Sequence, residues 1–177
     1  MTARERFRRR LCVWWWTVRK GRPQGQFHVP HQGLHPQHLV IIMPPEFAEF
    51  EAALPIVNPV IERLQPVQAT IIARDNFRSW LGQSSAFRLV TFDLNVHGWL
   101  GFPKSDLLHR MSKIGADVVL DLTSGFHPFT NGLAAAIGAP LRISFDVEPH
   151  HDFHNYVIRV DASKPLSERY RTLLGYV

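Results

Sequence analysis

Short apolar runs alternate with longer stretches in which apolar residues recur at helical spacing, from His38 to the end of the chain. The apolar runs predict strands over 38–43, 68–73, 88–92, 118–122, the residues that follow Pro140, and 156–160. Helical spacing with flanking prolines and glycines predicts helices over 45–64, 104–114, 129–137 and 165–174. Strands that alternate with helices in this way predict an α/β fold built on an open sheet.

The stretch 117–145 is the most regular part of this pattern and predicts a strand, a helix and a second strand, which together form a βαβ unit. Val118 to Leu122 form a nearly continuous apolar run, which is typical of a strand buried on both faces of a parallel sheet. The alanine-rich helix that follows ends at Gly138, with Pro140 just beyond it. We therefore expect an open, mostly parallel, Rossmann-like sheet with helices on both faces.

Polar residues follow the first strand of this unit. Because open parallel sheets bind ligands at the carboxyl ends of their strands, Thr123, Ser124 and His127 are candidate substrate contacts. The alternative for Thr123 and Ser124 is capping of the next helix. His97 follows the third strand and is expected to line the same crevice. Asp121 lies within the strand, and its plainest role is a bond to a neighbouring loop.

The length of 177 residues fits one folded domain, which we place at residues 38–177. Residues 1–37 differ in composition and form a basic, tryptophan-containing tail followed by a Pro/Gly/His-rich linker. A lone cysteine, Cys12, excludes an intramolecular disulfide and fits a reducing compartment. No apolar stretch approaches the roughly 18 to 20 residues of a membrane span, and no secretory signal is present, so we expect a cytoplasmic protein.

The net charge of +5 belongs to the tail. Residues 1–37 carry eight basic residues and one acidic residue, whereas the other 140 residues carry 12 basic and 14 acidic ones. A basic groove for nucleic acid is therefore not expected on the folded domain. Trp14, Trp15 and Trp16 lie between two basic clusters, and this arrangement predicts attachment of residues 4–22 to an anionic membrane surface. The alternatives are a short helix that packs its tryptophans on the domain, or a disordered lead-in.

The densest polar cluster runs from Asp146 to His154 and contains three histidines and three carboxylates. Such side chains can hold zinc, but their spacing matches no helix-borne ligand pair and Pro149 interrupts it, so a solvated loop is the favoured interpretation. The sequence lacks the Gly-x-Gly-x-x-Gly loop that binds dinucleotides and the Gly-x-x-x-x-Gly-Lys-Ser/Thr loop that binds nucleotide phosphates. It also lacks the Gly-x-Ser-x-Gly elbow that carries the nucleophilic serine of hydrolases. We expect no metal and no cofactor.

Two segments resemble the heptosyltransferase family, glycosyltransferase family 9. The helix over 48–64 begins Ala48-Glu49 and contains Pro55 six residues after Glu49, which is similar to the family's Gly-Asp pair and its helix-embedded proline. The segment ADVVLDLTSGFHPFTNGLAAAIGAPLRISF over 116–145 resembles the family's strand, polar loop, alanine-rich helix and Gly-Ala-x-x-Arg-Ile-Gly-Phe motif. The resemblance covers about residues 38–175.

The resemblance implies one lobe of a GT-B architecture, in which two Rossmann-like domains face each other. The N-terminal domain of such enzymes holds the acceptor and the C-terminal domain holds the nucleotide-sugar. They invert the anomeric centre without a metal, and the aspartate of the Gly-Asp pair is their proposed base. Glu49 stands at that position, while Phe129-Thr130 stands where the family has Arg-Ser. The residues alone favour Glu49 as a solvated acid in the first turn of a helix.

The function implied by the resemblance is that of an acceptor-side domain in the transfer of a sugar to a cell-envelope glycan or lipopolysaccharide-type acceptor. Since the sequence ends at Val177, where the family enters its second domain, we expect the nucleotide-sugar to bind only through a further C-terminal domain or partner chain. The isolated chain is then expected to be inactive or incomplete. The alternative is a non-catalytic α/β binding or scaffold module that docks on a membrane-associated partner.

Overall fold

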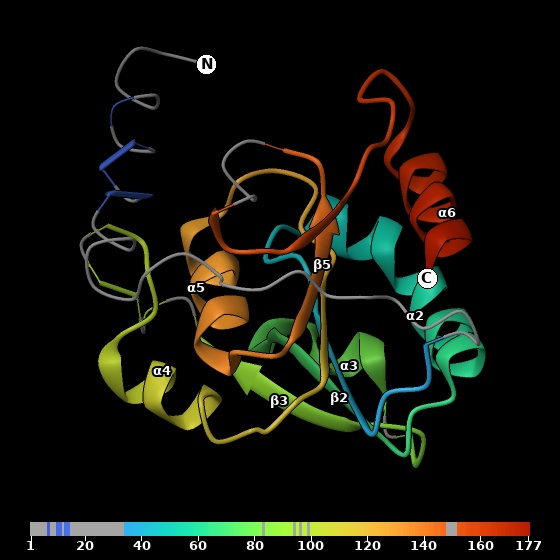
Figure 1. Ribbon diagram of the computed structural model, residues 1–177, viewed down its shortest axis with the longest axis horizontal. Coiled ribbons are helices and arrows are strands. Elements are labelled where there is room, and N and C mark those ends of the chain that lie inside the picture. The colour runs from blue at the N-terminus through green and yellow to red at the C-terminus, as the bar shows by residue number, and fades with distance from the viewer. Residues whose placement is uncertain are drawn as a thin grey trace.

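The computed structural model describes residues 34–177, apart from residues 83, 94, 96, 99 and 148–151, together with residues 7, 10, 11, 13 and 14. The described residues form a six-stranded sheet in which every neighbouring pair of strands is parallel, in the order β3-β2-β1-β4-β5-β6 (Figure 1). The strands are β1 (His38–Ile42), β2 (Gln68–Arg74), β3 (Arg88–Phe92), β4 (Val118–Asp121), β5 (Leu141–Phe145) and β6 (Tyr156–Ile158). The helices are α2 (Phe47–Leu64), η1 (Asp75–Phe77), α3 (Arg78–Leu81), α4 (Ser105–Met111), α5 (Pro128–Ile137) and α6 (Leu166–Tyr176).

Every predicted strand and helix is present, and the parallel, Rossmann-like sheet is confirmed. The ends differ by a few residues: α4 is shorter than the predicted helix over 104–114, and β6 ends at Ile158 rather than at residue 160. The prediction missed η1 and α3, which follow β2. These two elements span three and four residues, which is too short for apolar residues to recur at helical spacing.

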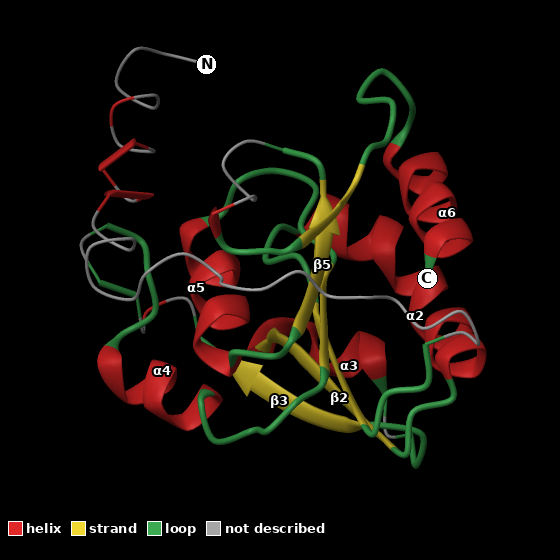
Figure 2. Ribbon diagram, in the orientation of Figure 1, coloured by secondary structure: helices red, strands yellow, loops and turns green. Residues whose placement is uncertain are grey.

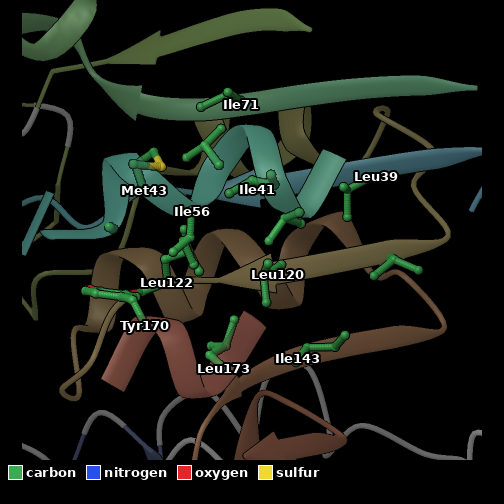
Figure 3. Packing of buried hydrophobic residues seen from close by; sticks show 14 of the residues in the cluster. Leu39, Ile41, Met43, Ile56, Ile71, Leu120, Leu122, Ile143, Tyr170 and Leu173 are labelled. Carbon is green, nitrogen blue, oxygen red and sulfur yellow. The ribbon is translucent and has the colours of Figure 1, made fainter. Parts of the chain in front are cut away.

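Side chains alternate between the two faces of each strand, and two hydrophobic clusters result. Leu39 and Ile41 of β1 join the first cluster, which α2 and α6 cover, whereas Val40 and Ile42 join the second, which α4 and α5 cover (Figure 2). Figure 3 shows side chains of β1, β2, β4 and β5 meeting those of α2 and α6 in the first cluster. Because both faces of the central strands are covered, most of their residues are apolar, as the sequence predicts.

The long helix α2 contains two prolines, Pro55 and Pro59, and yet remains continuous over 18 residues. Pro55 is exposed and Pro59 is half-buried, while Phe50, Ile56 and Val60 of the same helix are buried against the sheet. The backbone hydrogen bonds that the prolines remove therefore lie away from the core, where water can satisfy the freed carbonyl groups.

The strand order places a topological switch point between β1 and β4. The chain leaves β1 through α2 toward β2, on one side, and leaves β4 through α5 toward β5, on the other. The two helices cover opposite faces of the sheet. In open α/β sheets this arrangement leaves a crevice at the carboxyl ends of the two strands, and ligands bind there.

Candidate active site

Glu49 lies in the first turn of α2, just after β1 and beside the switch point. Its carboxylate contacts the loop that follows β4, although the two segments are 75 residues apart in the sequence. The Ser124 hydroxyl donates a 2.6 Å hydrogen bond to Glu49 Oε1, and the Ser124 amide donates a 3.4 Å bond to Oε2. Glu49 is half-buried in the first turn of α2, so its carboxylate is partly open to solvent and partly held by Ser124. The structure thus brings together two of the predicted site residues, from the segments that follow β1 and β4.

Thr123 has a structural role within the loop after β4. Its side chain is buried and donates a 3.1 Å hydrogen bond to the hydroxyl of Thr130, which in turn donates to the carbonyl of His127. His127 is the N-cap residue of α5, and no side chain caps this helix. The alternative interpretation, capping by Thr123 or Ser124, is therefore wrong. The two threonine hydroxyls instead tie the start of α5 to the end of β4.

His127 and His97 remain candidates on weaker grounds. His127 is half-buried at the start of α5, close in sequence to Ser124. His97 is exposed and forms an antiparallel bridge with Pro103. Among the residues that the structure describes, no hydrogen bond or ion pair joins His97 to Glu49 or Ser124. Contact of His97 with the crevice therefore stays a prediction.

Tyr170 of α6 is a site residue that the sequence did not reveal. Its side chain is fully buried, and its hydroxyl donates a 2.7 Å hydrogen bond to the carbonyl of Leu122, just after β4 (Figure 3). Burial raises the pKa of Tyr170 above its usual value, and the nearby carboxylates of Glu49 and Asp121 raise it further. The phenol therefore remains a neutral donor at physiological pH and holds the backbone two residues before Ser124.

Asp121 and His154 form a second polar pair at the end of β4, where the loop of Thr123 and Ser124 begins. The sequence predicted His154 only as part of the solvated polar stretch that starts at Asp146. Both side chains are fully buried, with His154 Nε2 at 3.4 Å from Asp121 Oδ2. Asp121 Oδ1 accepts a 3.0 Å hydrogen bond from the Thr123 amide. No periodic pattern marks a single buried histidine between strands, so only the folded chain identifies His154 as a partner of Asp121.

Two exposed aromatic side chains, at the start of α2 and in α3, contact each other and were not singled out by the sequence analysis. Phe47, the first residue of α2, contacts Trp80 of α3 edge-on at 5.5 Å between ring centroids. Phe47 is 45% exposed and Trp80 is 55% exposed. Exposed apolar surface of this kind is a common feature of interaction sites.

Within the described part of the chain, no group of three or more histidine, cysteine or acidic residues is placed to hold a metal ion. Residues 148–151 of the polar stretch that begins at Asp146 lie outside the described residues, so this observation concerns only the remainder of that stretch. Asp146 accepts a 2.9 Å hydrogen bond from Arg159 Nε.

The fold matches solved structures of sugar-transferring enzymes. The "E. coli heptosyltransferase WaaC with ADP" aligns with a TM-score of 0.59 at 12% identity, over 78% of this chain and 46% of that one. The "glycosyl transferase family 9 from Veillonella parvula DSM 2008" aligns with a TM-score of 0.60 at 15% identity, over 77% and 40%. The fold is that of a single heptosyltransferase lobe. The "E. coli ADP-heptose lps heptosyltransferase II" also aligns, with a TM-score of 0.58 at 14% identity, over 77% and 40%.

These comparisons establish the heptosyltransferase-like fold that the sequence resemblance predicted. The chain spans less than half the length of the heptosyltransferase structures it matches. No protein-family model matches the sequence, and no curated protein sequence matches it.

Proposed function

We propose that this heptosyltransferase-like chain is the acceptor-side lobe of a glycosyltransferase that transfers a sugar from a nucleotide-sugar to a cell-envelope glycan or lipopolysaccharide-type acceptor. The observation that carries the proposal is the Glu49–Ser124 contact at the switch point between β1 and β4. Open α/β sheets bind their ligands there, and the contact leaves Glu49 partly open to solvent. The matched structures include complexes with ADP and with an ADP-sugar analogue, which supports an ADP-sugar as the donor.

In the proposed reaction, Glu49 is the general base. Its carboxylate accepts the proton of an acceptor hydroxyl while the hydroxyl oxygen attacks the anomeric carbon of the sugar. The bond between that carbon and the donor phosphate breaks, and the electron pair leaves with the nucleoside diphosphate. A carboxylate suits this step because it accepts a proton within hydrogen-bond reach of the attacking oxygen. Ser124 holds one carboxylate oxygen at 2.6 Å and so orients the group before the acceptor binds.

The donor half of the reaction is proposed to come from a second lobe, in the same polypeptide or in a partner chain. The matched structures support this because they align with this chain over only 40–47% of their length. Thr123, Ser124, His127 and His97 are proposed to contact the acceptor or to shape its crevice. Since the Thr123 hydroxyl bonds to Thr130, its contribution is to hold the loop rather than to bind the substrate directly.

The test combines acceptor binding and transfer. In the first part, the full chain is titrated with the delipidated core of a heptose-free lipopolysaccharide. In the second part, transfer of the sugar from ADP-heptose to this acceptor is measured. The transfer is measured with and without a separately supplied donor lobe of a heptosyltransferase. We expect the chain to bind the acceptor by itself and to transfer sugar only with the donor lobe. Failure to bind any such acceptor, together with no transfer in either arrangement, would refute the function and favour a scaffold module.

Glu49→Gln tests the assigned base. The amide keeps the size of the side chain and its carbonyl accepts the Ser124 hydrogen bond, but it does not accept the acceptor proton. We expect acceptor binding to persist while transfer falls by about 100-fold or more. Glu51→Gln is the matched control, since Glu51 is exposed on the same helix. Equal transfer by the two variants would contradict the role of Glu49.

A further inference from the structure

The buried side chains of Asp121 and His154 form an imidazole–carboxylate pair at the end of β4. The pair takes no part in the reaction proposed above. Asp121 is the last residue of β4, and His154 belongs to the segment that leads into β6. The two side chains are fully buried, and His154 Nε2 lies 3.4 Å from Asp121 Oδ2. Burial of two ionisable groups costs free energy unless each is held by partners, so such a pair needs a structural or functional reason.

The segment that carries His154 is fixed on the sheet by its own hydrogen bonds. The Asn155 amide donates to the carbonyl of Arg142 at 3.1 Å, and the Arg142 amide donates to Asn155 Oδ1 at 2.8 Å. Arg142 Nε donates to the carbonyl of Phe153 at 2.9 Å. His154 therefore reaches Asp121 from a segment that β5 holds on both sides of it. The parallel connection from β5 to β6 contains no α-helix among its described residues, although Asp152 lies in a 3-10 turn.

Asp121 connects the pair to the site. While Oδ2 faces His154, Oδ1 accepts a 3.0 Å hydrogen bond from the Thr123 amide. The next residue, Ser124, donates its hydroxyl and its amide to Glu49. The contacts thus run from His154 to Asp121, from Asp121 to the backbone of the loop, and from the loop to the carboxylate of Glu49.

We propose that Asp121, braced by His154, is a positioning residue that fixes the loop after β4 so that Ser124 orients the Glu49 carboxylate. An effect of Asp121 on the rate of sugar transfer rests on the function proposed for Glu49. Its effect on the orientation of the Glu49 carboxylate does not. Asp121 neither touches the substrate nor exchanges a proton with it. Its contribution is to hold the Thr123 amide in one direction, because a loop that turns at Thr123 moves the Ser124 hydroxyl away from Glu49.

The experiment reads the Glu49 carboxyl directly, by ¹³C NMR of the full chain labelled at glutamate side chains and without any sugar. The Glu49 resonance is assigned by its absence in Glu49→Gln. We expect Asp121→Ala and His154→Ala each to move this resonance, since Ser124 then no longer holds the carboxylate in one position. Asp121→Asn keeps an oxygen that accepts the Thr123 amide, so we expect it to restore the wild-type resonance position.

Asp117→Ala is the matched control. Asp117 lies just before β4, at the opposite end of the strand, and its Oδ2 accepts a 2.8 Å hydrogen bond from the His38 amide. Its loss therefore removes the same kind of bond at a distance from the site and should leave the Glu49 resonance in place. The proposal is overturned if the folded Asp121 and His154 variants move the Glu49 resonance no more than this control does.

Amide hydrogen–deuterium exchange is a second measurement, which uses wild-type protein only. It tests the proposal even if the alanine variants do not fold. In wild-type protein the Thr123 and Ser124 amides should exchange with deuterium slowly, because both are held in the contacts above. Exchange at the rate of an open loop would overturn the proposal.

In the transfer reaction with a donor lobe, Asp121→Ala should lower kcat by about 10- to 100-fold with less effect on KM. Correct NMR and exchange results without any transfer would instead refute the function proposed for Glu49.

Discussion

At the scale of single residues, the position of Glu49 depends on a local feature and on a distant one. Locally, the extended backbone at Glu46 starts α2, which places Glu49 in the first helical turn, where the helix dipole stabilises a negative charge. The distant feature is Ser124, which supplies two donors to the carboxylate. The side chain is thereby held in one orientation beside the switch point between β1 and β4.

Ser124→Ala removes one of these donors and leaves Glu49 without its 2.6 Å partner. Because the bond involves a charged, half-buried acceptor, we expect the free energy of unfolding to fall by about 1–2 kcal/mol. Urea unfolding followed by circular dichroism measures this change. The control is Ser79→Ala, an exposed serine in α3, which should change stability by less than about 0.5 kcal/mol. Similar losses in both variants would show that the Ser124 bond contributes no stability.

At the scale of elements, α5 and α6 each make one close contact with a neighbouring segment. Gly132 of α5 packs against the segment at Phe102 and Pro103, and a Cβ at this glycine would lie 2.8 Å from Pro103 Cδ and 2.9 Å from Phe102 Cδ1. On the other face, Tyr170 of α6 reaches the carbonyl of Leu122. The two helices pack on opposite faces of the sheet, and α6 holds the backbone just after β4.

Gly132→Ala should destabilise the protein although alanine is the better helix former. The added methyl group forces a proline ring and an aromatic ring apart, and such overpacking costs about 1–3 kcal/mol. Gly175→Ala in α6 is the opposite case, because nothing lies within 4 Å of its added Cβ. It should leave stability unchanged or raise it by less than about 1 kcal/mol. Thermal unfolding of both variants measures the contrast, and a stabilised Gly132→Ala would contradict the packing described.

Tyr170→Phe tests the contact from α6 and carries a pH dependence. The variant leaves the buried carbonyl of Leu122 without this donor, and we expect a loss of about 1–3 kcal/mol at neutral pH. Above pH about 10 the unfolded wild-type chain releases the Tyr170 proton while the folded protein retains it, because the pKa of Tyr170 is raised in the fold. Wild-type stability therefore falls as pH rises through this range, by up to about 1.4 kcal/mol per pH unit.

Urea unfolding of wild-type and Tyr170→Phe protein, at about pH 9 and about pH 11, measures this slope on either side of the ordinary tyrosine pKa. The difference in stability between the two proteins should shrink at the higher pH. The exposed Tyr176 provides the control variant Tyr176→Phe, which should keep the wild-type slope. A constant difference between wild type and Tyr170→Phe would contradict the raised pKa.

At the scale of the whole molecule, the N-terminal segment differs in charge from the domain. Residues 1–37 carry eight of the 20 basic residues, and the remainder of the chain has a slight excess of acidic ones. Of residues 1–33 the structure describes only five. Among these, Leu11 and Val13 pack against the cluster of Leu100, Phe102 and Phe153, while Trp14 is 61% exposed. No helix within the described residues is long and apolar enough to span a membrane.

We propose that the basic segment attaches the protein to the inner face of a membrane, as the sequence predicts for residues 4–22. Each basic residue near an anionic surface contributes about 1 kcal/mol of attraction, so the full chain should sediment with anionic vesicles. It should remain in solution with vesicles of neutral lipids, and it should dissociate as salt screens the charges. Equal sedimentation with both kinds of vesicle would contradict an electrostatic attachment, and sedimentation with neither would favour packing of the segment on the domain.

The sequence by itself determined the elements and their class. Apolar runs such as Val118 to Leu122 mark strands covered on both faces, and the glycine and proline after α5 mark its end, because these signals depend only on neighbouring residues. The candidate site residues Glu49 and Ser124 followed from the same patterns and from the family resemblance. Short elements such as η1 and α3 left no periodic signal.

Only the tertiary structure decided which of these residues meet. The Glu49–Ser124 bond depends on β1 and β4 being neighbours, and the Asp121–His154 and Tyr170–Leu122 contacts join residues 33 and 48 positions apart. Such contacts arise from strand order and from helix packing on each face, which no local pattern of residues encodes. Packing between distant segments also explains why His154, which lies in a polar stretch of the sequence, is buried beside Asp121.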